Sequence, residues 1–521
     1  MRYASIFALA FIFIGLAFSQ APTYHEQYRP AYHFSPPQNW MNDPNGLLYL
    51  DGEYHLFYQY NPQGTGWGHM SWGHAVSTDL VHWQNLDVAI PEYNDIMIFS
   101  GSAIADKDNV SGLCDPSLKG KGCILAFYAA QSSKGQAQAV AFSNDHGRTF
   151  TEYANNPIID EGLTNFRDPK VFYHEASKRW IMVTVLADVQ KVRFYGSKNL
   201  LQWTPLSEFG PAGKTDAAWE CPDLFPMDLE NQSETKWVLL ISAGPHVQYF
   251  VGDFDGQTFT NSSPKDTVLI LDQGQDHYAA ITFNDAPDNR RLLIGWLDNW
   301  AYAGNLPTTV WRGQQSIVRE LRLQSYPEGP RLLQWPVHEL TQLRTNPVHY
   351  DNLQLNSSQS QVTLNIHGSQ LEILAAFKYP LSGGNIPKEF GVKVFVGQDQ
   401  ETVIGYDLTT GEVFVDRTKS GLSSFSNSFA TRSSANMTVN YGLVQLHIFV
   451  DTSSIDLFAN TGRVTMSHLI YPDPSQDQVV VYAVGGEVLL TSIDAWSLNG
   501  IWPAAPTPKP TASKNFIPIK M

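Results

Sequence analysis

Short runs of alternating apolar and polar residues recur along the chain, and turn-forming residues separate them. Residues 46–50 and 53–60 are two such runs, and the dipeptide Asp51-Gly52 joins them. This arrangement predicts two strands connected by a two-residue hairpin turn. No long segment carries the 3.6-residue period of a helix, so the pattern predicts an all-β protein.

A weak repeat is visible at the turns. Segments 77–83 and 197–203 lead from a serine through a polar turn to a tryptophan, and 143–150 and 252–259 are looser versions that end in phenylalanine. The closing residues are 67, 53 and 56 positions apart, by subtraction along Trp83, Phe150, Trp203 and Phe259. A four-stranded propeller blade with long loops needs a period of this size, and residues 30–335 hold roughly five such periods.

The pattern changes beyond Arg331. Residues 337–344 predict a short linking helix, and alternating runs between 350 and 500 predict a β-sandwich. These runs are 362–366, 390–396, 412–416, 446–458 and 479–484. We therefore expect a propeller domain at 20–335, a linker at 336–349, a sandwich at 350–502 and a proline-rich tail at 503–521.

Residues 1–19 predict a secretory signal peptide. Arg2 precedes the apolar run 6–18, and the small residues Ala17 and Ser19 stand where a signal peptidase reads. The mature chain is therefore expected to start near Gln20. We expect it to be secreted, because no later segment predicts a membrane span. The formal net charge of −16 argues against nucleic acid or another polyanion as a partner.

The cysteines and glycosylation sequons fit a secreted protein. Cys114 and Cys123 flank a loop rich in lysine and glycine, and they could form a disulfide. Cys221 would then be a free thiol, which we expect to be buried. The predicted N-glycosylation sites are Asn109, Asn231, Asn261, Asn356 and Asn436.

One carboxyl group lies in the run Trp40-Met41-Asn42-Asp43-Pro44-Asn45-Gly46. Proline and glycine restrict the backbone there, and the run stands at the entry to the predicted hairpin. A rigid carboxylate with an aromatic neighbour suits the nucleophile of a carbohydrate enzyme. The alternative is that Asp-Pro-Asn-Gly forms only a turn.

Two more carboxyl groups lie in short motifs. Asp168 follows Arg167 and precedes a proline, which fits either a functional site or a surface salt bridge. Glu220 stands between Trp219 and Cys221, a relatively apolar setting. Such surroundings raise the pKa of a carboxyl group and suit a general acid, although a solvent-facing glutamate is the alternative.

A polar residue recurs once in each predicted blade. The intervals are 57, 68, 52 and 56 residues, by subtraction along Asp43, Ser100, Asp168, Glu220 and Asp276. If the innermost strand of each blade supplies one of these residues, all of them meet in a single axial pocket.

Taken together, the motifs resemble glycoside hydrolase family 32, the β-fructofuranosidases (invertases, exo-inulinases and levanases). The resemblance covers nearly the whole mature chain. It rests on the run 40–46 and on Tyr58-Gln59-Tyr60-Asn61-Pro62, Trp67-Gly68, Phe99-Ser100-Gly101-Ser102, Phe166-Arg167-Asp168-Pro169 and Trp219-Glu220-Cys221-Pro222. Residues 405–407, 414–417 and 448–451 are similar to the sandwich signatures of this family. The resemblance implies a five-bladed β-propeller followed by a C-terminal β-sandwich, in agreement with the repeat.

The resemblance also implies residue roles. Asp43 would be the nucleophile, Glu220 the acid/base and Asp168 a stabiliser of the transition state. We expect Arg167 to keep Asp168 ionised. The substrate-binding residues that the resemblance implies are Trp40, Asn42, Gln59, Trp67, Phe99, Ser100, Arg167, Asp276 and Trp300. The implied reaction releases a terminal β-D-fructofuranosyl unit by a retaining double displacement.

Several alternatives stay open at the level of sequence. Sucrose, inulin and levan present the same terminal unit, and a fructosyltransferase would use the same scaffold. The presence of all three acids argues against a non-catalytic fructan-binding protein. No cofactor is expected, and no metal, because His69 and His74 lack the i, i+4 spacing and flanking glutamate of a helical zinc site. The sequence leaves the oligomeric state open, and we expect the sandwich to act as a support or an oligomer contact.

Overall fold

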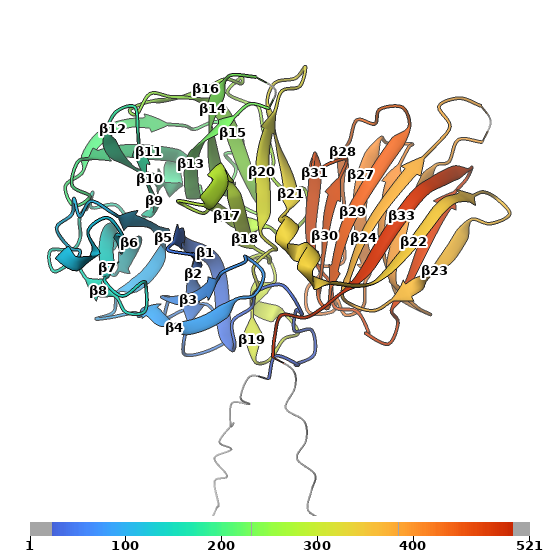
Figure 1. The fold of residues 1–521 in the computed structure, drawn as a ribbon, viewed down its shortest axis with the longest axis horizontal. Helices are drawn as coiled ribbons and strands as arrows, with labels where there is room; N and C mark the ends of the chain where they lie inside the picture. Colours follow the sequence, from blue (N-terminus) through green and yellow to red (C-terminus); the bar gives the residue numbers. More distant parts are fainter. Residues whose placement is uncertain (1–22, 231, 384, 504–521) are drawn as a thin grey trace, which may run out of the picture.

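The computed structural model describes residues 23–503 except 231 and 384. Two β-rich bodies lie side by side (Figure 1): a propeller in blue to yellow, and a sandwich in yellow to red. The predicted signal peptide and residues 504–521 of the predicted tail lie outside the described residues. Within the described part, no helix is both long and apolar enough to cross a bilayer.

The first body is a five-bladed β-propeller, because it consists of five sheets arranged around an axis. Blade 1 contains β1 (Asn39–Leu50), β2 (Glu53–Asn61), β3 (Ser71–Ser77) and β4 (Gln84–Ile90). Blade 2 contains β5 (Met97–Asp106), β6 (Cys123–Ser132), β7 (Gly135–Ser143) and β8 (Thr151–Glu152). Blade 3 contains β9 (Phe166–His174), β10 (Arg179–Leu186), β11 (Lys191–Ser197) and β12 (Thr204–Phe209).

Blade 4 contains β13 (Glu220–Asp228), β14 (Thr235–Ala243), β15 (His246–Phe254) and β16 (Phe259–Asn261). Blade 5 contains β17 (Tyr278–Thr282), β18 (Leu292–Trp296), β20 (Arg319–Gln324) and β21 (Arg331–Pro336). The first strand of each blade is innermost, and each of these strands contacts its two neighbours around the axis. A further strand, β19 (Trp311–Arg312), leaves blade 5 and pairs in parallel with β1, so the end of the ring is joined to its beginning.

The repeated turns connect the third and fourth strands of blades 1 to 4. In each turn an Asp or Asn side chain accepts a backbone N–H three or four residues further on, at 2.7 to 2.9 Å. Such side-chain-to-backbone bonds stabilise a turn locally. The accepting residues are Asp79, Asp145, Asn199 and Asp255. The repeat therefore marks the blades as predicted.

The second body is a β-sandwich of two six-stranded sheets. One sheet contains β22 (Arg344–Leu355), β33 (Val488–Leu498), β24 (Leu371–Lys378), β29 (Leu443–Asp451), β30 (Ser454–Ala459) and β31 (Val464–Leu469). The other contains β23 (Gln361–His367), β32 (Gln478–Val484), β25 (Glu389–Val396), β26 (Glu401–Asp407), β27 (Glu412–Lys419) and β28 (Arg432–Asn436). Side chains from both sheets form one apolar core, as expected when two sheets pack face to face.

The connection between the two bodies is the 3₁₀ helix η5 (His338–Leu343). Because β22 already pairs with β33 from Arg344, the connection is shorter than the expected linker 336–349. The remaining 3₁₀ helices lie in propeller loops: η1 (Pro116–Leu118), η2 (Ala187–Val189), η3 (Pro287–Asn289) and η4 (Ala303–Asn305).

Buried ion pairs hold the sandwich against the propeller. Arg319 of β20 donates to Asp272 at 2.8 Å and lies 3.4 Å from Asp456 of β30. His33, in the segment before β1, lies between Asp451 and Asp456, with its ring nitrogens 2.8 and 2.9 Å from their carboxylates. The sandwich therefore supports the propeller through charged groups that water does not reach.

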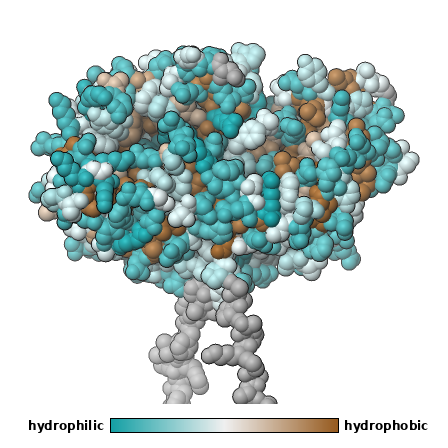
Figure 2. All heavy atoms as spheres, in the orientation of Figure 1, coloured by the Kyte–Doolittle hydropathy of each residue, from teal (hydrophilic) through white to brown (hydrophobic). Residues whose placement is uncertain are grey.

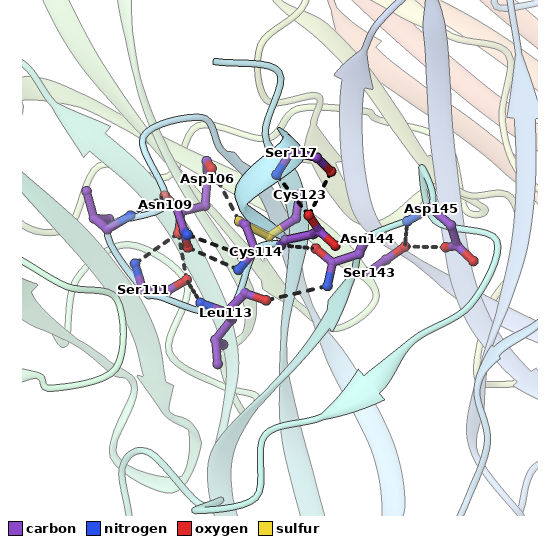
Figure 3. Close-up of a disulfide and its surroundings, with 12 residues drawn as sticks. Asp106, Asn109, Ser111, Leu113, Cys114, Ser117, Cys123, Ser143, Asn144 and Asp145 are labelled. Carbon is purple, nitrogen blue, oxygen red and sulfur yellow. Dashed lines mark hydrogen bonds between the residues drawn. A yellow bond between two sulfur atoms is a disulfide. The ribbon is translucent and has the colours of Figure 1, made fainter. Parts of the chain in front are cut away.

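The described surface in Figure 2 is mainly hydrophilic, with hydrophobic residues scattered over this face. Cys114 and Cys123 form a disulfide, as predicted, and Cys221 is a buried free thiol. The disulfide closes a loop between residues 114 and 123, and just before this loop Asn109 bonds the backbone of Cys114 through both ends of its amide (Figure 3). Among the sequon asparagines, Asn436 is exposed, Asn109, Asn261 and Asn356 are partly buried, and Asn231 lies outside the described residues.

Candidate active site

All five innermost strands carry a β-bulge at an equivalent position near their start. In each bulge, two residues of the inner strand lie opposite a single residue of its partner strand. A bulge turns the local side chains away from the regular alternation of the strand, which here directs them toward the axis. The bulged positions are 42–43, 99–100, 168–169, 221–222 and 279–280.

Proline and left-handed backbone conformations accompany these bulges. Pro169 and Pro222 lie inside two of them, where the missing N–H removes no ladder bond. Asp168 and Cys221 have φ angles of 60° and 46°, a conformation that costs a non-glycine residue about 1–3 kcal/mol. The run around Asp43 is not a turn, because it lies inside β1 and its bulge.

The Asp43 carboxylate accepts hydrogen bonds on both oxygens. Ser100 Oγ donates to Oδ2 at 2.6 Å, and Asn42 Nδ2 donates to Oδ1 at 3.0 Å. Cys221 Sγ lies 3.5 Å from Oδ2. Burial raises the pKa of Asp43, the Ser100 bond opposes this rise, and the charge of Glu220 adds to it. Asp43 remains partly exposed, so a substrate can reach it.

Asp168 is more enclosed, with 5% of its surface exposed. Its Oδ2 accepts the Cys221 N–H at 2.8 Å and lies 3.8 Å from Arg167 Nε. Burial raises the pKa of Asp168 to about 7, and the opposing charge of Arg167 does not cancel that rise. The expectation that Arg167 keeps Asp168 ionised is therefore wrong on the acid side of neutral pH, because desolvation outweighs the guanidinium.

Glu220 keeps about 30% of its side-chain surface exposed, and two donors position it. Arg167 Nη2 donates to Oε1 at 3.0 Å, and the Tyr278 hydroxyl donates to Oε2 at 2.6 Å. Trp219 points into the core between blades 3 and 4, where its indole N–H donates to Lys214 O. The predicted apolar setting is therefore wrong for the carboxyl group itself, which faces a cation and a phenol.

Aromatic side chains border the carboxyl groups. Trp67 and Trp300 are 50% and 47% exposed, unusually high values for tryptophan. Trp67 meets Phe99 edge to face at 6.0 Å, and Trp300 stacks on the buried Trp40 at 5.8 Å. These rings provide apolar surfaces against which a sugar face can pack.

Three further predicted residues position their neighbours. Trp40 Nε1 donates to Asn42 Oδ1 at 2.8 Å, which orients the Asn42 amide toward Asp43. Gln59 lies opposite the β1 bulge and donates to Ile98 O at 2.9 Å, at the start of β5. Trp40 and Gln59 are buried, so they shape the pocket from behind.

Asp276 does not lie with these residues, which corrects its predicted role. Its buried carboxylate pairs with Arg417 of the sandwich at 2.5 Å and accepts the Leu469 N–H and the Tyr302 hydroxyl. The fifth blade instead contributes Tyr278, which the sequence reasoning missed. Tyr278 stands directly before the β17 bulge, as Glu220 stands before the β13 bulge, so the blade period could have located it.

The pocket is closed beneath the acids. Lys170 is buried and lies 3.2 Å from the Asp223 carboxylate, and it also donates to Thr282 O at 2.8 Å. Asp223 Oδ2 accepts the N–H and hydroxyl of Thr282 at 2.6 and 2.8 Å. These residues follow the bulges of blades 3, 4 and 5, so they lock the three bulges to one another. A void of about 10 Å³ lies there.

The arrangement suits acid-base and nucleophilic chemistry at one carbon. Two carboxyl groups face a common space, one held by neutral donors and the other by Arg167 and Tyr278. Over the described residues, no group of three His, Cys, Asp or Glu side chains is placed to hold a metal ion. His69 bonds Glu92 at the surface, and His74 is buried against His55.

Comparison with known proteins gives consistent matches along the chain. Residues 33–336 match the glycosyl hydrolases family 32 N-terminal domain, and residues 339–497 match the glycosyl hydrolases family 32 C terminal. A levanase from Bacillus subtilis (strain 168) is 43% identical over 97% of this chain and 76% of its own length. An extracellular exo-inulinase, inuE, from Aspergillus ficuum is 35% identical over 96% of this chain and 99% of its own.

The solved structures add a similar neighbour. The crystal structure of an exo-inulinase from Aspergillus awamori superposes with a TM-score of 0.85 at 35% identity, covering 92% of this chain and 100% of that chain. Sequence and architecture therefore agree over both bodies of the molecule.

Proposed function

Because the chain belongs to glycosyl hydrolase family 32, we propose that this glycoside hydrolase is secreted and releases terminal β-D-fructofuranosyl units from sucrose and fructans with retention of configuration. This proposal rests mainly on two carboxyl groups of one pocket. Asp43 accepts hydrogen bonds on both oxygens, and Glu220 is partly exposed. The names of the relatives, levanase and extracellular exo-inulinase, support fructans as substrates and an extracellular location.

In the first step, Asp43 attacks C2 of the fructosyl unit and forms a covalent ester. The bond from C2 to the leaving oxygen breaks, and Glu220 gives its proton to that oxygen. Ser100 and Asn42 hold the Asp43 carboxylate in one orientation, which suits an attack along a fixed line.

In the second step, Glu220 takes a proton from water, and the resulting hydroxide attacks C2. The bond from C2 to Asp43 breaks, which returns both carboxyl groups to their starting states. Tyr278 and Arg167 hold the Glu220 oxygens, so Glu220 can act as the acid in the first half-reaction and as the base in the second.

Asp168 would hold the ring hydroxyls of the bound sugar. With its pKa near 7, it is mainly protonated in mild acid, and it can then donate as well as accept a hydrogen bond. A neutral Asp168 also reduces the repulsion among three carboxyl groups in one pocket.

The closed floor favours action at a chain end. Lys170 and Asp223 fill the axis below the acids, so a polymer cannot pass through the pocket. The exposed rings of Trp67 and Trp300 border the opening, where a terminal ring can enter between them.

Product analysis tests this function. The purified protein is incubated with sucrose, inulin and levan, and the sugars are separated over time. We expect free fructose from the earliest samples and no ladder of shorter fructans. NMR of the first fructose formed, before mutarotation, should show the β-anomer. Oligomer ladders or the α-anomer would contradict terminal release by double displacement, and new transfer products as the main species would identify a fructosyltransferase instead.

A further inference from the structure

A second concavity, here called the side cavity, opens on the same face of the propeller as the catalytic pocket. Its volume is about 600 Å³, within the range of small-molecule sites. Its walls are the turn 93–96, the β6–β7 hairpin and the segment 156–163. Met97 pairs with Gln131 in the sheet, which places the hairpin at the same end of blade 2 as Ser100.

Two walls of the side cavity lead directly into the catalytic pocket. Ile96 is four residues before Ser100, and Leu163 is four residues before Arg167. At about 3.3 Å per residue, each path is at most roughly 13 Å long. Phe99, which adjoins Ser100, meets the ring of Trp67, and the exposed His69 bonds Glu92, the residue before Tyr93 of the side cavity, at 2.8 Å.

The lining of the side cavity suits a neutral sugar. Its floor contains Ala130 and Ala137, which pair across the ladder, and the neighbouring Ala139. These small side chains leave space above the sheet and offer an apolar surface. Hydrogen-bonding groups surround the floor, both neutral (Asn94, Ser132, Ser133 and Asn156) and charged (Asp95, Lys134 and Asp160). A sugar ring has a C–H face for such a floor and hydroxyls for such walls.

We propose that the side cavity binds sugar units of a fructan chain that lie beyond the bond being cleaved. This inference rests on the proposed function, because it gives a binding site to the rest of the fructan chain whose terminal unit occupies the catalytic pocket. Sucrose is too short to reach the side cavity. The cavity therefore increases the affinity for polymers without changing the chemical step.

The larger cavity of the molecule provides a control. It has a volume of about 1000 Å³ and lies at the other end of the inner strands, below the buried pair of Lys170 and Asp223. Charged side chains such as Lys178 and Glu175 line it, and the buried pair of Lys170 and Asp223 separates it from the catalytic acids.

The test blocks the side cavity from its exposed rim. Ser133→Trp places an indole over the cavity without entering the core, and Lys198→Trp makes a matched change at the exposed rim of the opposite cavity. Ala137→Leu fills the cavity from its floor as a second variant. Steady-state rates are measured on sucrose, inulin and levan, and thermal unfolding checks the fold of each variant.

We expect Ser133→Trp and Ala137→Leu to raise KM for inulin or levan about tenfold, with kcat unchanged and with less than a twofold effect on sucrose. Lys198→Trp should change none of these values. Equal losses on sucrose and polymer, or no loss on either, would overturn the side-cavity proposal. A wild-type protein inactive on all three substrates would instead overturn the proposed function, so the two failures are distinguishable.

Discussion

Ionisation of Asp168 should reduce the stability of the folded protein as the pH rises to neutral and above. Its pKa rises from an ordinary value of 3.8 in the unfolded chain to about 7 in the fold, chiefly because burial disfavours the charged form. A raised folded pKa means that the stability is fully present below pH 3.8 and is lost as the pH rises through about 7. At 1.36 kcal/mol per unit, the full loss is about 4 kcal/mol.

Asp168→Asn removes this titration while keeping the size of the side chain. Relative to wild type, the variant should gain about 1.6 kcal/mol at pH 5, where only part of the penalty has developed, and about 4 kcal/mol at pH 8. The difference corresponds to roughly 4 °C in melting temperature for a domain of this size. The same variant should lose most of its activity.

Differential scanning calorimetry at pH 5 and pH 8 measures this effect. Asp272→Asn is the matched control, because Arg319 lowers the pKa of Asp272 despite its burial. That variant should be destabilised by the same amount at both pH values, since Asp272 is ionised in both states. A gain for Asp168→Asn that is equal at pH 5 and pH 8, or a loss at pH 8, would refute the reasoning.

Further predictions concern the carboxyl groups and the interface. Asp43→Asn should lower kcat by several orders of magnitude while the protein stays folded, because an amide does not form the ester; substantial residual turnover would exclude this residue as the nucleophile. Tyr278→Phe should lower kcat about tenfold, since Glu220 loses a donor; an unchanged kcat would limit Tyr278 to packing. Despite burial, hydrogen bonds to Asp451 and Asp456 raise the pKa of His33 to about 9. The resulting stability, about 3 kcal/mol, is present below pH 6.5 and lost as the pH rises through 9, so melting curves of His33→Gln should lack the alkaline decline of wild type.

Local sequence determined much of the architecture. Alternation and turn residues predicted the β-strands, because side chains in a strand alternate faces and turns need particular backbone angles. The repeat at Trp83, Phe150, Trp203 and Phe259 predicted the blades, because each turn is closed by its own Asp or Asn within a few residues. The motifs around Asp43, Asp168 and Glu220 predicted which acids meet.

Contacts between distant segments decided what the sequence did not. Asp276 and Tyr278 are two residues apart, and only the register of the β17 bulge and the position of Arg417 determine which of them faces the pocket. The adjacent Arg167 suggested an ionised Asp168, yet the surrounding blades exclude water and favour the protonated form. The pairing of Asp276 with Arg417 and the desolvation of Asp168 both depend on segments more than 50 residues away. No local pattern encodes them, whereas turn chemistry and alternation act between neighbours.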